Sequence, residues 1–188
     1  RQWCREVRQG QHAEYGTPAL YLQHGVNSGG TRGILTPLIE YALESGGLRT
    51  LIGRYTYADL RLSAMETFFD MVPPELIVDQ DVQEHRYSLQ AQGGESQVFF
   101  GPLKKLLSKG SQEYAVIAVV EALELTLGMY RTLKRRCRQG QRPAFLLMEG
   151  NPPTEGHWLT QLTDPRHPDH DASLKKIVLT SRENWAHM

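Results

Sequence analysis

The sequence has few cysteines and no long apolar run. Its 188 residues include two cysteines, Cys4 and Cys137, which lie far apart in the chain. Two such residues form neither a metal-ligand spacing nor a disulfide framework, so we expect reduced thiols in a cytosolic setting. Residues 1–11 are too polar for a signal peptide, and no apolar run reaches the roughly 18 residues of a membrane helix. The sequence therefore predicts a protein that does not interact with a membrane.

The chain also lacks net charge, since 21 Lys and Arg residues balance 21 Asp and Glu residues. No global field therefore directs the protein to nucleic acid or to a lipid surface. One local cluster is basic and comprises Lys134, Arg135, Arg136, Arg138 and Arg142. A solvated helix end is the favoured interpretation, because cations suit the negative end of the helix dipole. A surface that follows DNA is the alternative.

No internal repeat or low-complexity tract is present, and the length suits one domain with a short N-terminal extension at about residues 1–18. Apolar runs alternate with helical periodicity. We expect strands at 19–23, 48–54, 115–120, 144–148 and 175–180, a hairpin of 86–90 with 97–100, and helices at 31–43, 59–71 and 123–138. Residues 115–120 form an unbroken apolar run, which is typical of a central parallel strand. This order predicts a three-layer α/β fold whose mainly parallel sheet has helices on both faces.

The loop after the first strand is rich in glycine and leads into a helix. Such a position binds phosphate, because the backbone N–H groups of a helix N-terminus point at the anion. Gly29 and Thr31 match the pattern G-x-x-x-x-G-K-[ST], whereas His24 stands at the first Gly and Gly30 at the Lys. The sequence thus predicts a degenerate phosphate-binding loop, and a glycine-rich turn without a ligand is the alternative.

Two further strand ends carry polar groups. In P-loop ATPases the acidic strand ends in two carboxylates, one for Mg²⁺ and one that polarises the attacking water. Here Val120 stands at the first position and Glu121 keeps the second, although a Glu that caps a helix is the alternative. Asn151 follows the next apolar strand and suits the sensing of a γ-phosphate. An Asn that bonds its own backbone in a Pro-terminated turn is the alternative there.

Together these segments resemble the ATPase domain of tailed-phage terminase large subunits, from about residue 20 to residue 184. The segments that carry the resemblance are Ser28-Gly29-Gly30-Thr31-Arg32 for S-G-K-T-R, residues 54–63 for R-x-T-x-x-D-L-R-x-S, Phe99-Phe100-Gly101-Pro102-Leu103, residues 120–125 for D-E-A-x-E-L, and residues 150–159 for G-N-P-P-x-x-G-H-W. Five matches in the family's order make a chance resemblance improbable. Residues 1–188 then correspond to a single ATPase domain, and we expect the family's C-terminal nuclease domain to be absent.

The resemblance implies an ATP-driven motor in the host cytoplasm that moves double-stranded DNA into a preformed capsid. It implies a ring of identical subunits, a portal protein, a small terminase subunit, and ATP with Mg²⁺ as cofactors. The nucleotide would contact Gly25, Asn27, Ser28, Gly29, Gly30, Thr31, Arg32 and Arg54, with Thr31 also at the metal. Glu121 and Asn151 would be the catalytic residues.

Two departures from the family pattern predict impaired hydrolysis. Gly30 removes the Lys charge and Val120 removes the first carboxylate, and the loss of one such electrostatic stabiliser slows a reaction by about a hundred- to a thousandfold. We expect Gly30→Lys with Val120→Asp to restore turnover. The alternatives are an inert nucleotide-binding or interaction module that keeps the fold, and another P-loop enzyme such as a helicase-like ATPase.

A last cluster contains Asp164, His167, Asp169, His170 and Asp171 around two prolines. These residue types bind metals. A polar, Pro-punctuated surface loop is nevertheless the favoured interpretation.

Overall fold

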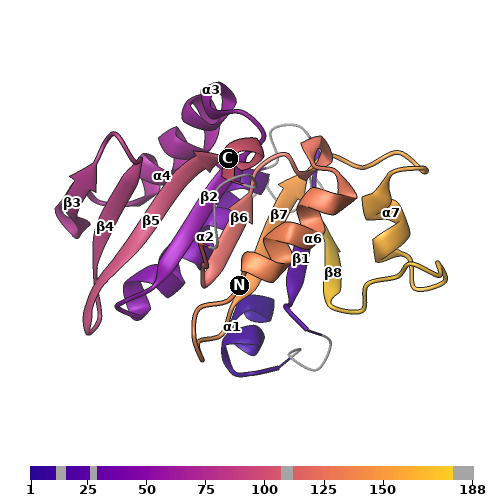
Figure 1. The fold of residues 1–188 in the computed structure, drawn as a ribbon, viewed down its shortest axis with the longest axis horizontal. Helices are drawn as coiled ribbons and strands as arrows, with labels where there is room; N and C mark the ends of the chain where they lie inside the picture. The colour runs from indigo at the N-terminus through magenta and orange to yellow at the C-terminus, as the bar shows by residue number, and fades with distance from the viewer. Residues whose placement is uncertain (12–15, 26–28, 107–111, 180–188) are drawn as a thin grey trace.

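The computed structural model describes residues 1–11, 16–25, 29–106 and 112–179. Within these ranges a single eight-stranded sheet has the order β3-β4-β5-β2-β6-β7-β1-β8 (Figure 1). The strands are β1 (Ala19–Gln23), β2 (Arg49–Arg54), β3 (Ile77–Asp81), β4 (Arg86–Ala91), β5 (Gly94–Pro102), β6 (Val116–Val119), β7 (Phe145–Gly150) and β8 (Leu174–Val178). From β5 to β8 all neighbours are parallel, whereas β4 runs antiparallel to β5 and β3 antiparallel to β4.

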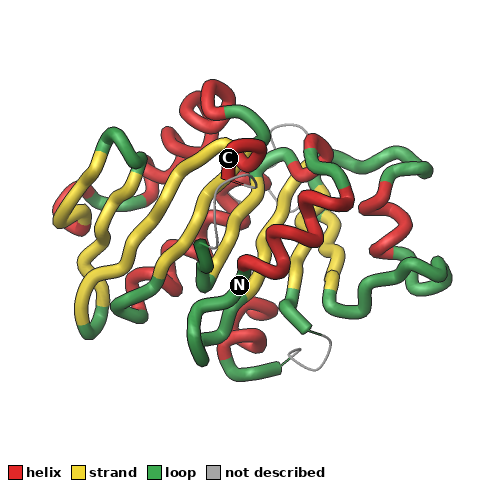
Figure 2. Tube along the Cα trace, viewed as in Figure 1, coloured by secondary structure: helices red, strands yellow, loops and turns green. Residues whose placement is uncertain are grey.

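Helices cover both faces of this sheet. They are α1 (Gln2–Arg8), α2 (Gly30–Glu44), α3 (Tyr57–Leu60), α4 (Glu66–Met71), α5 (Leu103–Leu106), α6 (Leu127–Arg136) and α7 (Trp158–Thr163), with short turns η2 (Arg61–Met65), η3 (Pro74–Leu76) and η4 (Ala122–Glu124). Figure 1 shows α6 in front of the sheet and α2 behind it. The same alternation of helix and strand along the chain is visible in the trace of Figure 2. The predicted three-layer α/β fold is therefore confirmed.

Alternate side chains of each strand feed two separate apolar clusters. In β1, Leu20 belongs to the cluster under α1, α2 and α4, whereas Tyr21 belongs to the cluster under α6 and α7. In β6, Val116 and Ile117 divide in the same way, and all four residues of this strand are fully buried. A parallel strand with helices on both faces needs apolar side chains on both sides. The interior position of residues 115–120, which the unbroken apolar run predicts, is thus confirmed.

Several element boundaries differ from the prediction. The helix expected at 123–138 begins only at Leu127, because Thr126 caps it by accepting a hydrogen bond from the Met129 N–H at 3.2 Å. The helix expected at 59–71 is instead three pieces, α3, the π-helical turn η2 and α4. The last strand ends at Val178, and residue 180 lies outside the described residues.

Several elements were missed in the sequence, among them α1, β3, α5 and α7. Helix α1 lies in the expected N-terminal extension and buries Trp3, Cys4 and Val7 against the core, although the rest of it is polar. Strand β3 is a mostly exposed edge strand, so it lacks the apolar run that identifies the central strands. Helix α7 is also too short for a clear helical period.

Both cysteines are free and buried, and burial raises the pKa of Cys4 to about 11 and that of Cys137 to about 12. Among the helices of the described part, none is long and apolar enough to cross a bilayer.

Candidate functional site

The polar residues predicted to act together follow the carboxyl ends of neighbouring parallel strands. The loop after β1 begins at His24, the loop after β6 contains Glu121, and Asn151 follows β7. Strand β7 lies between β6 and β1, so the side chain at its end reaches both neighbouring loops. Open α/β sheets bind their ligands at this edge.

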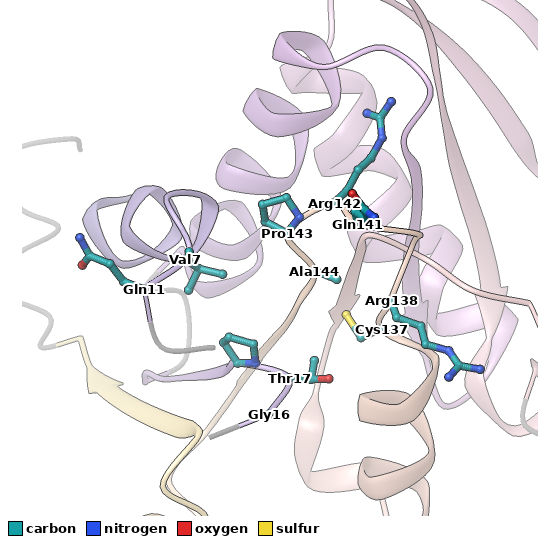
Figure 3. Close-up of a pocket in the computed structure, with 12 residues that line it drawn as sticks. Val7, Gln11, Gly16, Thr17, Cys137, Arg138, Gln141, Arg142, Pro143 and Ala144 are labelled. Atoms are coloured by element: carbon teal, nitrogen blue, oxygen red, sulfur yellow. The ribbon is translucent and has the colours of Figure 1, made fainter. Parts of the chain in front are cut away.

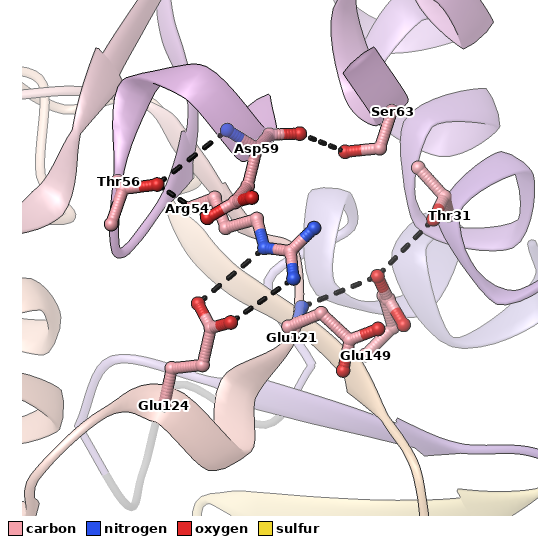
Figure 4. A network of polar contacts seen from close by, with 8 residues as sticks. All are labelled: Thr31, Arg54, Thr56, Asp59, Ser63, Glu121, Glu124 and Glu149. Atoms are coloured by element: carbon pink, nitrogen blue, oxygen red, sulfur yellow. Dashed lines mark hydrogen bonds and ion pairs between the residues drawn. The ribbon is translucent and has the colours of Figure 1, made fainter. Parts of the chain in front are cut away.

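Glu149, near the end of β7, connects these segments. Its side chain is 1% exposed, and its Oε2 atom contacts Nε2 of His24. Its Oε1 atom accepts hydrogen bonds from the Thr31 hydroxyl at 3.2 Å and from the Glu121 backbone N–H at 3.3 Å (Figure 4). One buried carboxylate therefore links the loop after β1, the start of α2 and the end of β6.

No role was predicted for Glu149 from the sequence. The available signal was an acid among the apolar residues of a buried strand, where an unpaired carboxylate is strongly unfavourable. Its partners were not visible, because His24 lies 125 residues away in the chain.

His24 is 9% exposed and has an oxygen atom beside each ring nitrogen. Nδ1 lies 2.8 Å from the Gly25 carbonyl oxygen, while Nε2 contacts Glu149. The hydrogen bond to Glu149 raises the pKa of His24 above its usual value, although burial acts in the opposite direction. The ring also lies against the backbone of Gly30, where an added Cβ atom would be 1.9 Å from Nε2.

The start of α2 is the place at which the sequence predicts an anion-binding backbone. Gly29 is the N-cap and has a φ of 75°, a left-handed conformation that glycine adopts without strain. The first N–H groups of any α-helix lack partners within the helix, and such groups can bind an anion. Arg32 is exposed in this first turn, and its carbonyl accepts a hydrogen bond from the Thr36 hydroxyl at 2.8 Å. Asn27 and Ser28, two of the predicted contacts, lie outside the described residues.

Glu121 has an unusual backbone conformation at the end of β6. Its φ of 58° and ψ of 63° place a non-glycine residue in the left-handed region, which is uncommon and strained. Burial, followed by the nearby Glu149 carboxylate, raises the pKa of Glu121, whereas Arg54 lowers it. Strain of this kind concentrates at functional sites, where surrounding contacts hold the residue in place.

Arg54 lies at the same edge but takes part in a separate set of contacts (Figure 4). Its guanidinium forms an ion pair with Glu124 in η4 at 3.0 Å. Beyond it, Thr56 caps α3, and the Ser63 hydroxyl donates to the Asp59 carbonyl at 2.7 Å inside the π-helical turn. Single π turns are frequent at functional sites. The segment 54–63 is thus placed beside the Glu149 contacts.

Asn151 lies next to Gly150, the last residue of β7. Its carbonyl oxygen accepts a 2.5 Å hydrogen bond from the Tyr21 hydroxyl, which holds this turn against β1. Burial, together with the Glu149 and Glu121 carboxylates, raises the pKa of Tyr21, so the phenol keeps its proton and donates.

The oxygen and N–H groups at this edge suit a magnesium nucleotide. The first turn of α2 offers N–H donors for phosphate, and Mg²⁺ prefers hydroxyl and carboxylate oxygens such as those of Thr31 and Glu149. Val120, at the family's first acid position, is 2% exposed and packs in the apolar cluster under α2. The carboxylate that contacts Thr31 therefore comes from β7 instead of β6.

A separate cavity of about 400 Å³ lies at the opposite edge of the sheet (Figure 3). Thr17 and Pro18, before β1, and Ala144, before β7, line it together with Val7 of α1. None of the predicted nucleotide contacts is among its lining residues. This cavity therefore belongs to the amino ends of the strands and is distinct from the candidate site.

The basic cluster, which begins in the last turn of α6 and continues after it, is partly used within the fold. Lys134 forms an ion pair with Asp171 at 2.8 Å, Arg138 with Glu113 at 2.6 Å, and Arg142 donates to the Gly46 carbonyl at 2.8 Å. Asp171 is thus engaged in an ion pair. The described residues contain no group of three or more His, Cys, Asp or Glu side chains arranged to hold a metal ion.

The sheet order, the loop that leads into α2 and the acidic edge define an α/β fold of the P-loop NTPase type. Solved structures of large terminases share it over nearly the whole chain. The large terminase of the thermophilic bacteriophage D6E with ADP matches with a TM-score of 0.75 and 13% identity, over 98% of this chain and 46% of that one. The same protein with ATP-γ-S matches with a TM-score of 0.74 and 12% identity, over 98% and 46% of the two chains.

The ATPase domain of the Thermus phage P74-26 large terminase matches with a TM-score of 0.61 and 12% identity, over 96% of this chain and 82% of that one. The chain therefore has the fold of a terminase large-subunit ATPase domain and spans about half the length of the D6E proteins. No family model and no curated relative matches the sequence.

Proposed function

We propose that this chain is the nucleotide-binding ATPase domain of a DNA-packaging motor of the large-terminase type. The observation that carries the proposal is the Glu149 carboxylate, which contacts Thr31 at the start of α2 and the Glu121 backbone after β6. The loop that binds phosphate and the strand that carries the catalytic acid are thereby joined at the edge where α/β sheets bind ligands.

Each residue at this edge has a role in the proposal. The N–H groups from Gly29 to Arg32 bind the phosphates, and the Thr31 hydroxyl with Glu149 would hold Mg²⁺, whose charge offsets that of the phosphate oxygens. Glu121 orients the attacking water. Asn151 is close to the phosphates through its position after β7, and Arg54 lies at the rim. In this proposal Gly25, Asn27 and Ser28 also contact the nucleotide.

Hydrolysis is proposed to be slow. Neither Gly30 nor Val120 offers a charged side chain, and a positioned base alone contributes only about a hundred- to ten-thousandfold. An inert module is the second candidate. The observation in its favour is that two carboxylates, Glu121 and Glu149, lie near each other beside the N-terminus of α2, where they oppose the entry of an anion.

The partners follow from the proposed motor. They are double-stranded DNA, a portal protein, a small terminase subunit and further copies of this chain in a ring, all in the host cytoplasm. Because the chain spans about half of the D6E proteins, these partners belong to the proposal for the whole motor.

Equilibrium binding of fluorescently labelled ATP, with and without Mg²⁺, tests the proposed function. We expect binding that Mg²⁺ strengthens, and we expect Thr31→Ala to remove most of this strengthening. Thr36→Ala is the matched control, because Thr36 is on the same helix and its hydroxyl contacts only the Arg32 carbonyl among the contacts described. Absence of binding at millimolar nucleotide in the folded protein would support the inert module and contradict the proposal.

Glu121→Gln tests the catalytic assignment separately. The variant should bind labelled ATP as the unaltered protein does and lose the remaining hydrolysis. Unchanged hydrolysis would show that Glu121 does not orient the attacking water.

A further inference from the structure

Two exposed arginines of α6 have no ionic partner in the described part of the chain. Arg131 and Arg135 are four residues apart, so their side chains lie on one face of the helix. The opposite face buries Tyr130 and Leu133 against the sheet. Arg135 donates a hydrogen bond to the Thr132 hydroxyl at 3.0 Å and forms no ion pair with a described residue. Because like charges four residues apart destabilise a helix, this pair does not serve the stability of α6.

The helix dipole accounts for only part of the charge on α6. Its last turn contains Lys134, Arg135 and Arg136, and cations in that turn suit the negative end of the helix. Lys134 also has a carboxylate partner in Asp171. The effect of the dipole falls off within one turn, so it does not reach Arg131. Neither an ion pair nor the dipole therefore accounts for Arg131.

A third arginine without an ionic partner borders the end of α6. The Cζ atom of Arg49, at the start of β2, lies 5.0 Å from the ring centroid of Phe99 and 5.8 Å from that of Tyr114. The Tyr114 N–H donates to the Arg136 carbonyl at 3.0 Å, so this ring is joined to the last residue of the helix. The Nε atom of Arg49 is buried and has no hydrogen-bond partner. Because an unpaired buried donor opposes folding, the fold alone does not account for Arg49.

The three arginines lie on the same side of the sheet. Tyr114 belongs to the apolar cluster under α6 and α7, and Phe99 packs against that cluster, so the Arg49 side chain is on the α6 side. Figure 1 shows α6 in front of the sheet, whereas α2, which begins at the candidate nucleotide site, lies behind it. The two surfaces are therefore separate.

We propose that the phosphate backbone of double-stranded DNA binds to Arg49, Arg131 and Arg135, which together form the arginine surface. The inference rests on the proposed function, in which DNA is the partner. The planar guanidinium group suits phosphate, because it donates two parallel hydrogen bonds. Two residues four positions apart are separated by about 6 Å along a helix, and duplex DNA carries one charge per roughly 1.7 Å of its axis. One stretch of duplex can therefore contact both arginines of α6 together.

Binding of fluorescently labelled duplex DNA, measured by anisotropy at several salt concentrations, tests this inference. Arg131→Ala with Arg135→Ala changes only the exposed face of α6, and thermal melting reports whether the variant is folded. Each lost phosphate contact makes the plot of log affinity against log salt shallower by about 0.9. The slope of this double variant should therefore decrease by about 1.8, and by the same amount for duplexes of unrelated sequence.

Lys175→Ala with Lys176→Ala is the matched control. It removes two exposed cations from β8 and changes the net charge by the same amount, but these residues lie outside the arginine surface. Its salt slope should equal that of the unaltered protein. An equal decrease in both double variants would show that DNA responds to net charge alone, and the inference would be wrong.

Two substitutions of Arg49 separate its charge from its packing between the rings. Arg49→Gln removes the charge, so the slope should decrease by about 0.9, whereas Arg49→Lys keeps the charge and should keep the slope. A role in packing alone would lower the melting temperature of both variants and leave both slopes unchanged. That result would remove Arg49 from the arginine surface.

The outcomes also distinguish this inference from the function on which it rests. Absence of DNA binding at about 50 mM salt, or an unchanged slope in the Arg131 and Arg135 variant, would overturn the inference. Displacement of DNA by polyglutamate as effectively as by unlabelled duplex would also overturn it, because the surface would then suit an acidic protein. All these variants should keep their affinity for labelled ATP. If the unaltered protein binds DNA through these arginines but binds no ATP, the proposed function fails and the arginine surface stands.

Discussion

Two ion pairs lie at opposite ends of the parallel strands and hold their carboxylates in different ways. At the carboxyl ends, Glu149 bonds His24, Thr31 and the N–H of Glu121. At the amino end of β8, Asp171 accepts from Tyr130 at 2.7 Å and Lys134 at 2.8 Å, and from Ser173. The second group joins α6 to the segment before β8, and none of its own residues is a non-glycine residue with positive φ. The first lies beside Glu121 in its left-handed conformation.

The difference separates a carboxylate that serves packing from one that, in the proposed function, would also serve a ligand. Burial raises the pKa of Asp171, but hydrogen bonds from Lys134, Ser173 and Tyr130 outweigh it and hold the pKa at about 2. Glu149 is more deeply buried, and its neighbours are the groups that a phosphate and a divalent cation would contact. A group that is stabilised by fold contacts alone can be replaced with loss of stability only, whereas the Glu149 contacts should affect binding as well.

The largest effect is expected for Glu149→Leu. This change leaves the buried His24 ring and Thr31 without their acceptor, and the loss of one partner of a buried ion pair destabilises by about 3–5 kcal/mol. The change in the free energy of unfolding is measured by urea denaturation monitored with circular dichroism. The folded variant should also lose its binding of labelled ATP. A loss below about 1 kcal/mol would show that the pair contributes little to the fold.

The free energy of unfolding should fall by a smaller amount, about 1–3 kcal/mol, in Asp171→Asn. This change weakens the contacts of Lys134 and Tyr130 at the other end of the strands. Unfolding in urea is the measurement. The two variants should differ in ATP binding. The Asp171→Asn protein should keep its affinity for labelled ATP, whereas the Glu149→Leu protein should lose it. Weaker ATP binding in the folded variant would contradict the division into a packing pair and a ligand pair.

The pH dependence of stability should also identify Asp171. Its pKa is lowered from 3.8 to about 2, so its contribution is present above about pH 4 and is lost as the pH falls towards 2. At neutral pH this contribution is about 2 kcal/mol. Thermal melting between pH 6 and pH 2 should therefore show a steeper loss for the unaltered protein than for Asp171→Asn. Parallel curves for the two proteins would be evidence against the lowered pKa.

The smallest effect, of opposite sign, is expected for Glu121→Gly. Glycine adopts the left-handed conformation without strain, and the change removes a carboxylate whose pKa is raised by burial and by Glu149. The free energy of unfolding should rise by about 1 kcal/mol, although glycine also gains freedom in the unfolded state. ATP hydrolysis should be lost. Glu124→Gly is a control outside the left-handed region, and it should destabilise by breaking the ion pair with Arg54.

Much of the fold was predictable, because its signals are local. The apolar runs of β1, β6 and β7 have both faces buried, so they contain few polar residues to obscure the pattern. Strand β3 and helix α1 were not predictable in the same way. The first is an exposed edge, and the second buries only Trp3, Cys4 and Val7.

The candidate site was predictable only in part. The glycines and Thr31 before and within α2, and Glu121 after β6, are marked by their place at a strand end. The sequence also shows that Gly30 and Val120 stand where the family pattern has a Lys and an acid. The left-handed conformation of Glu121 is not, because it depends on the contacts that hold its backbone N–H against Glu149.

The sequence by itself determined the central strands and the longer helices between them, the two-sided burial of those strands and the loop that leads into α2, since each follows from residue periodicity and from glycine. The tertiary structure alone decided that β7 lies between β6 and β1, and therefore that Glu149 contacts both His24 and Thr31. It also decided that the His24 ring fills the space beside Gly30. These contacts join residues more than a hundred positions apart, or opposite sides of one loop, and only the closed sheet brings them within reach.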